Sequence, residues 1–80
     1  MATLELRPAR MKYYLDGRPV NGGDLLELCV SSGWLTGRFE LGRAEDDPPS
    51  LHLSVELERG GQAQLSIPIP EGACLRWPVG

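Results

Sequence analysis

The sequence is poor in the residues from which catalytic and metal sites are usually built. It has one histidine, His52, and its two cysteines, Cys29 and Cys74, lack the CxxC spacing of a zinc site. No carboxylate pair lies at a recognisable spacing, and neither GxGxxG nor GxxxxGKS occurs. We therefore predict a protein that is not an enzyme, with no catalytic residue, no cofactor, no metal site and no small-molecule substrate.

Long apolar runs are also missing. No stretch approaches the roughly 20 apolar residues that span a bilayer, and the N-terminal MATLELRPAR has no continuous apolar region like that of a signal peptide. These absences predict no membrane association and a cytoplasmic location. In that reducing compartment Cys29 and Cys74 are expected as buried free thiols. A disulfide is the alternative, if the two predicted strands that carry them are neighbours.

Positive charge is scarce. Eight Lys and Arg residues stand against eleven Asp and Glu residues, which gives a net charge of −3 at pH 7. Nucleic-acid binding proteins display a basic field that neutralises phosphates, so the charge balance argues against a nucleic-acid partner. Basic residues do gather locally, at Arg7, Arg10, Lys12 and Arg18. This basic edge supports the alternative hypothesis, a barrel associated with nucleic acid.

Glycine and proline, by contrast, are abundant. Ten glycines and seven prolines lie between apolar runs of an 80-residue chain. This distribution of glycine and proline predicts one domain, residues 1–80, made of short strands joined by turns. Residues 1–10 are expected to form an N-terminal strand or arm. Residues 42–50, GRAEDDPPS, are expected to form a mobile, acidic, proline-rich loop.

Period-two alternation of apolar and polar residues is clearest at 51–57 and 63–69. It predicts a β-hairpin with one buried and one solvated face, turning at 59–62. The segments 25–30 and 34–41 alternate in the same way, and residues 31–33 are predicted to join them as a short hairpin connection. Asp16-Gly17 is a further predicted turn. Shorter strands are predicted at 3–6, 12–15 and 73–77. A single helical turn at 24–28 is the alternative for that segment.

Six or seven short strands with tight turns predict an all-β fold, a small barrel that is closed or half-open, with at most one helical turn. Closure would remove the exposed edges that a flat sheet leaves. A core of this size gains stability by burying further apolar surface, so self-association is expected.

A long segment of the chain resembles a known family. YYLDGRPVNGGDLLELCVSSGWLTGRFEL, followed by EGACLRW, resembles short prokaryotic proteins that are catalogued as a domain of unknown function. The matching positions are Tyr14, Leu15, Asp16, Gly17, Gly23, Asp24, Leu26, Glu27, Trp34, Arg38, Glu40 and Gly72. Residues 42–70 have no counterpart in the pattern. The resemblance implies a small β fold and supplies no activity.

A second likeness concerns the middle of the chain. Gly-Asp-x-Leu-Glu-Leu followed by Gly-Trp-x-x-Gly-Arg is similar to the centre of Src-homology-3 (SH3) domains. The matching positions are Gly23, Asp24, Leu26, Glu27, Trp34, Gly37 and Arg38. The likeness implies an SH3-like barrel. In SH3 domains the tryptophan walls a groove for proline-rich peptides, but the closing Pro-Ser-Asn-Tyr is absent here, so binding of that kind is not expected.

The aromatic residues provide the candidate binding site. Trp34 and Trp77 each lie at the end of a predicted strand, where a tryptophan either closes the core or forms part of a contact surface. Tyr14, Trp34 and Arg38 belong to residue types that are enriched at binding hot spots, and they are the candidate partner-binding residues. The expected partner is another protein or a second copy of the chain. Asp24 is instead expected to accept hydrogen bonds from backbone N–H groups of its turn.

Overall fold

The computed structural model describes residues 2–7, 12–43 and 47–79. Within these ranges it holds nine β-strands and no helix, which confirms the predicted all-β class. The alternative of a helical turn at 24–28 is not realised, because the chain is extended there. Arg10 of the basic edge and part of the predicted loop lie outside the described residues.

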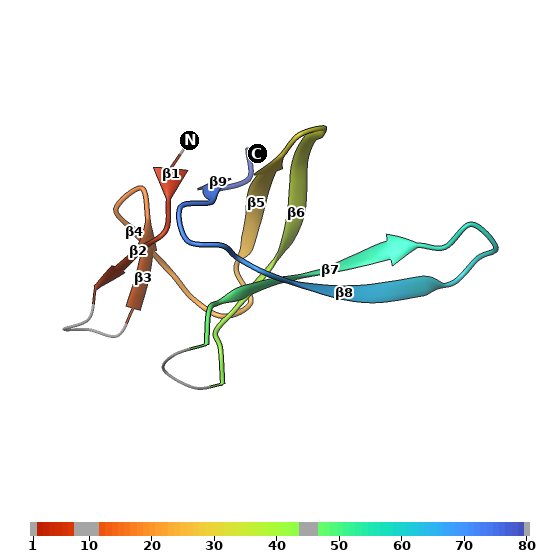
Figure 1. Ribbon diagram of the computed structural model, residues 1–80, viewed down its shortest axis with the longest axis horizontal. Helices are drawn as coiled ribbons and strands as arrows, with labels where there is room; N and C mark the ends of the chain where they lie inside the picture. The colour runs from red at the N-terminus through yellow and green to blue at the C-terminus, as the bar shows by residue number, and fades with distance from the viewer. Residues whose placement is uncertain (1, 8–11, 44–46, 80) are drawn as a thin grey trace.

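The nine strands form two antiparallel sheets (Figure 1). The larger sheet has six strands in the order β1-β9-β5-β6-β7-β8, and the smaller has three in the order β2-β3-β4. The strands are β1 (Ala2–Thr3), β2 (Glu5–Arg7), β3 (Lys12–Leu15), β4 (Arg18–Val20), β5 (Leu25–Val30), β6 (Gly33–Glu40), β7 (Ser50–Glu56), β8 (Gln62–Pro68) and β9 (Cys74–Arg76).

The predicted count of six or seven strands is too low at the N-terminal end of the chain. The predicted strand at 3–6 is divided at Leu4, so β1 pairs with β9 of the large sheet while β2 pairs with β3 of the small one. Leu4 itself packs against the core. The segment Arg18–Val20, which follows a predicted turn, forms a further strand against β3. The N-terminal residues therefore connect the two sheets.

One hydrophobic core lies between the sheets. Leu15 and Val20 enter it from the small sheet, and Leu26, Phe39 and Leu51 enter it from the large one. The ring of Tyr13 meets that of Phe39 edge to face, with centroids 5.8 Å apart. No closed barrel forms among the described residues, because β1 and β8 end the large sheet on opposite sides.

The predicted turns are present. Asp16 and Gly17 both have positive φ, 54° and 74°, as a tight turn between β3 and β4 requires. The side chain of Asp24 accepts a hydrogen bond from the N–H of Asn21 at 2.8 Å, which confirms its predicted capping role. This turn leads directly into β5, the strand that carries much of the candidate site.

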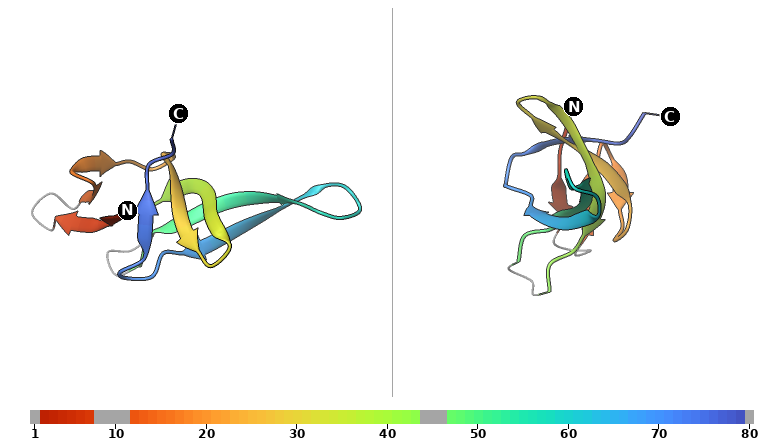
Figure 2. Two further views of the ribbon diagram at one scale, coloured as in Figure 1. Left: turned by 90° about the horizontal axis from the view of Figure 1, so that it is seen from above. Right: turned by 90° about the vertical axis from the view of Figure 1, so that its right-hand side faces the viewer.

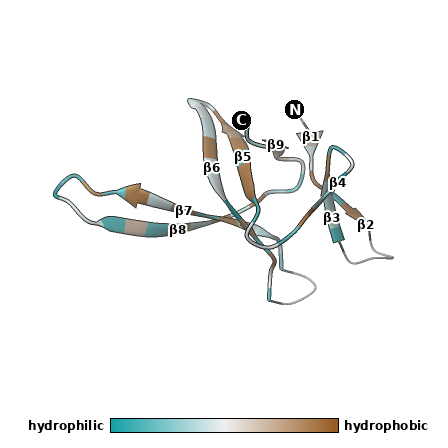
Figure 3. Ribbon diagram, turned by 180° about the vertical axis from the view of Figure 1, so that it is seen from behind, coloured by the Kyte–Doolittle hydropathy of each residue, from teal (hydrophilic) through white to brown (hydrophobic). Residues whose placement is uncertain are grey.

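The β7–β8 hairpin is confirmed, but only its base is buried as predicted. Leu51 and Leu53 are buried near the base, whereas Leu57 and Leu65 are 50% and 44% exposed. The outer half projects away from the rest of the molecule (Figures 1 and 2). Apolar residues continue along β7 into this projecting part (Figure 3). No described segment packs over them, so the predicted buried face is exposed there.

Candidate functional site

The large sheet has one face on the core and a second face turned away from it. Because side chains alternate along a strand, burial of Leu26, Leu28 and Phe39 directs their neighbours to the second face. Pairing of β5 with β6 then sets three outward pairs side by side. We call this surface the outer face. Its members are Leu25, Glu27, Cys29, Trp34, Thr36, Arg38, His52 and Arg76.

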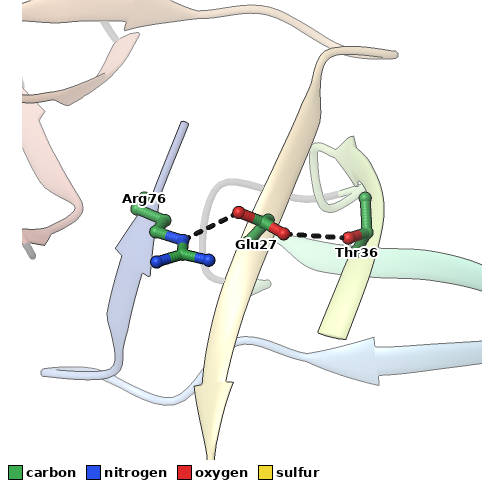
Figure 4. A network of polar contacts seen from close by, with 3 residues as sticks. All are labelled: Glu27, Thr36 and Arg76. Carbon is green, nitrogen blue, oxygen red and sulfur yellow. Dashed lines mark hydrogen bonds and ion pairs between the residues drawn. The ribbon is translucent and has the colours of Figure 1, made fainter. Parts of the chain in front are cut away.

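Trp34 is held in place on the outer face by a polar network that spans three strands. The guanidinium of Arg76 lies 3.9 Å from the centroid of the Trp34 ring. Arg76 Nε donates to Glu27 Oε1 at 2.7 Å, and Thr36 Oγ1 donates to Glu27 Oε2 at 3.2 Å (Figure 4). The Arg76–Glu27 contact is a charge-assisted hydrogen bond between partly buried groups, which is stronger than a neutral one. The network therefore fixes the orientation of an aromatic ring at the surface.

Arg38 extends the outer face beyond this network. It lies on the same strand face as Trp34, opposite Leu25 on β5 and His52 on β7. Arg38 is exposed and has no ion-pair partner among the described residues. Leu25 beside it is 53% exposed. The surface continues into a shallow hollow lined in part by Glu40, His52, Ser66 and Pro68.

Tyr14, the third candidate residue, is not part of this face. It lies on β3 in the small sheet and is only 7% exposed. The guanidinium of Arg7 lies 4.1 Å from the centroid of its ring. The structure thus brings Trp34 and Arg38 together and places Tyr14 on another part of the molecule.

The second tryptophan plays a different part from the first. Trp77 packs against the core, and its Nε1–H donates to the backbone carbonyl of Leu15 at 2.9 Å. The guanidinium of Arg18 lies 4.1 Å from the centroid of its ring. Trp77 therefore closes the end of the core, whereas Trp34 lies outside it.

Both cysteines are free, as predicted, but neither is fully buried: Cys74 is half-buried and Cys29 is exposed. Its position explains the difference, because Cys29 pairs with Trp34 on the outward side of β5. The two strands predicted as possible neighbours do lie side by side: Glu27 is opposite Arg76 and Leu28 is opposite Leu75. The same register continued by one residue places Cys29 level with Cys74.

Metal-binding groups do not converge on the described part of this surface. Among residues 2–7, 12–43 and 47–79, no three His, Cys, Asp or Glu residues are placed to hold a metal ion. His52 Nε2 lies 3.4 Å from Ser66 Oγ. The same part of the chain contains no helix long and apolar enough to cross a membrane. The chemistry that the outer face does offer is an aromatic ring, a free guanidinium and exposed apolar surface.

Sequence reasoning missed the residues that support Trp34. The alternation that placed Leu26 and Leu28 on one face already implied that Leu25, Glu27 and Cys29 share the other. No pattern in the sequence indicated the role of Arg76, because that role depends on pairing between β5 and β9, which lies far along the chain.

Comparison with known proteins gives no match: no family model, no curated protein and no solved structure matches the chain. The likenesses noted in the sequence therefore stay predictions.

Proposed function

We propose that the chain is a non-enzymatic β domain that binds another protein through the outer face, with Trp34 and Arg38 as the central contacts. The observation that carries the proposal is the combination of a ring pinned by Arg76 and an unpaired guanidinium on the same open sheet face. Trp and Arg are the residue types most enriched among binding hot spots.

The geometry favours a rigid contact. A side chain that is already ordered loses less conformational freedom on binding, and the network around Trp34 supplies that order before a partner arrives. A complementary partner would set a carboxylate against Arg38 and an apolar side chain against Trp34 and Leu25. The shallow hollow beside His52 enlarges the contact area.

The alternative, a nucleic-acid partner on the basic edge, is less favoured. Two of its described members already contact rings within the chain, Arg7 on Tyr14 and Arg18 on Trp77. Arg7 also lies 3.7 Å from the carboxylate of Glu5. These contacts leave Lys12 as the described basic residue of that edge without such a partner.

We further infer that the fold is a half-open relative of the SH3-like barrel. Its support is the Gly23-Asp24 turn that leads into β5, followed by Trp34 at the start of β6. The continuous antiparallel run from β5 to β8 is the second support.

The test is capture of partners from a native lysate, with mass spectrometry of the proteins retained. Arg38→Glu and Trp34→Ala should each remove the proteins that the unaltered chain retains. Lys12→Glu makes the same charge change on the basic edge, and we expect it to leave capture intact. Retention should also persist at raised salt, because phosphate contacts weaken steeply with salt while an aromatic protein contact does not.

Loss of capture in Lys12→Glu but not in Arg38→Glu would overturn the proposal in favour of the basic edge. Equal capture by all variants would show that the outer face does not bind the retained proteins.

A further inference from the structure

A second surface lies on the other side of the hairpin, at the free edge of β8. Within the described residues this strand pairs only with β7, so the backbone groups on its other side have no strand partner. Unpaired N–H and C=O groups at a sheet edge are a template for pairing with another strand. The edge belongs to the projecting part of the molecule, where no other described element approaches it (Figures 1 and 2).

The hydrogen bonds at the two ends of the hairpin show which groups face the free edge. Leu57 N–H donates to Gly61 C=O at 3.0 Å, and Ile69 N–H donates to Pro49 C=O at 2.9 Å. In an antiparallel pair, hydrogen-bonded and non-hydrogen-bonded positions alternate. Ala63, Leu65 and Ile67 therefore direct their backbone groups toward β7. The residues between them direct theirs outward: Gln62, Gln64, Ser66 and, through its carbonyl alone, Pro68.

The edge also lacks the features that usually prevent pairing. None of the seven residues of β8 is charged, although 24% of the whole chain is charged. Proteins protect exposed edges with lysine, inward charges, bulges or very short strands. Here the one protective residue is Pro68, at the end of the strand. An uncharged edge meets no repulsion from an identical one.

The monomer exposes more surface than its size requires. Its accessible area is 5774 Å², whereas a compact monomer of 8.8 kDa exposes about 4800 Å². The excess of about 1000 Å² is comparable to the roughly 800 Å² that one partner buries in a standard interface. The radius of gyration, 13.2 Å, likewise exceeds the roughly 11.6 Å expected for 80 residues.

We propose that β8 pairs antiparallel with β8 of a second copy of this chain, about a two-fold axis at Leu65. Outward-facing residues must pair with outward-facing residues, so Gln64 of each copy is opposite Ser66 of the other. Leu65 then faces its own copy at a non-hydrogen-bonded position, where Cα atoms lie about 4.5 Å apart. The exposed apolar side chains of both hairpins fall on one side of the joined sheet.

The exposed apolar surface at the axis supports this register. Leu65 is 44% exposed in the single chain and meets Leu65 of the second copy there. Ser66 and Pro68 also line the hollow beside His52, but the backbone edge of β8 is distinct from the Trp34 and Arg38 contacts, so the inference goes beyond the proposed protein-binding function.

The first test is sedimentation equilibrium of the full chain over a wide range of concentrations. We expect a monomer–dimer equilibrium. Gln64→Pro removes an outward N–H and spares the ladder with β7, and it should raise the dimer dissociation constant at least about tenfold. Gln64→Lys should weaken the dimer as well, through like charges that lie diagonally across the axis from each other. Ser54→Lys adds the same charge on the same sheet face, opposite Gln64 on β7, and should leave dimerisation unchanged.

Cross-linking tests the register without relying on these variants. In a Cys29→Ser, Cys74→Ser background, Leu65→Cys should form a disulfide between copies when a small-molecule disulfide is added, because the Cα spacing suits the bond. The small-molecule disulfide is reduced as the two thiols are oxidised. Leu57→Cys is a matched control of similar exposure just after β7, and it should stay monomeric.

A chain that is monomeric at all concentrations would overturn the inference, and so would assemblies that grow beyond a dimer. Equal cross-linking of the two cysteine variants would exclude the register. The two proposals fail separately: Arg38→Glu should lose the lysate partner and keep the dimer, and Gln64→Pro should do the reverse.

Discussion

At the scale of single residues, the two tryptophans differ in what holds them. Trp77 packs on the core and donates a hydrogen bond to the carbonyl of Leu15, which joins the C-terminal segment to the small sheet. Trp34 is held by Arg76 and lies on the outward side of β6. The same substitution in the two positions should therefore have different consequences.

Trp77→Ala should lower the free energy of unfolding by about 2–4 kcal/mol, since it removes core packing and leaves the Leu15 carbonyl without its donor. Trp34→Ala should lower it by about 1 kcal/mol, the scale of an exposed cation–π contact with some lost packing. Chemical denaturation of both variants measures the difference. A loss at Trp34 as large as that at Trp77 would mean that Trp34 supports the core and not a contact surface.

The residues of the outer face could be predicted only where the signal was local. Alternation along one strand placed Trp34 and Arg38 on the same side, and the structure has them there. Tyr14 has the same residue-type signature but lies in the other sheet, and no local pattern distinguishes the two sheets. Gly37 permits a close backbone approach, because a Cβ there would lie 3.1 Å from the carbonyl oxygen of His52.

At the scale of elements, the β7–β8 hairpin is the part of the fold that depends least on the rest of the chain. Its register runs without interruption from Ser50–Pro68 to Glu56–Gln62. The turn that closes it contains Gly60 and Gly61, with φ of 91° and 86°. Side chains other than glycine rarely adopt such values, so the turn residues fix the register of both strands.

Replacing both turn glycines, Gly60→Val and Gly61→Val, should lower the free energy of unfolding by more than about 1 kcal/mol, because β-branched residues resist positive φ. Gly22→Val is the matched control in another turn, since Gly22 does not have a positive φ and a Cβ there would meet only Glu40 Oε2 at 3.8 Å. Thermal or chemical unfolding gives the comparison. Unchanged stability in the double variant, or an equal loss in the control, would contradict a turn with this geometry.

Elements defined by pairing between distant segments were harder to predict. The hairpin, the β5–β6 pair and the turn at Asp16-Gly17 all join neighbouring segments, and the sequence predicted each of them. The division of the N-terminal strand at Leu4 depends on β9 and β3, which lie far apart in the sequence. Whether the predicted barrel is closed or half-open could not be predicted for a similar reason: strand alternation says which face is buried and does not say which edges meet.

At the scale of the whole molecule, stability is concentrated at one end. The buried residues gather where the small sheet, β5, β6 and β9 meet, with the base of β7 and β8 beside them. The outer half of the hairpin has ladder hydrogen bonds but little buried apolar surface. Regions of this kind open locally without unfolding of the whole domain.

Native-state hydrogen exchange should therefore distinguish two parts of the chain, one that exchanges by global unfolding and one that exchanges by local opening. In dilute protein, the amides of Leu28 and Phe39 should exchange only through global unfolding, because their hydrogen bonds lie against the core. The amides of Val55 and Ala63 are also hydrogen-bonded but should exchange through local opening, with an opening free energy that changes little with added denaturant.

Raising the protein concentration should slow exchange at Gln64 and Ser66 if a second copy covers the β8 edge, while Leu28 serves as the internal reference. Exchange of Val55 and Ala63 as slow as that of Leu28 in dilute protein would show that the hairpin is an integral part of the core, and the excess surface would then need another explanation.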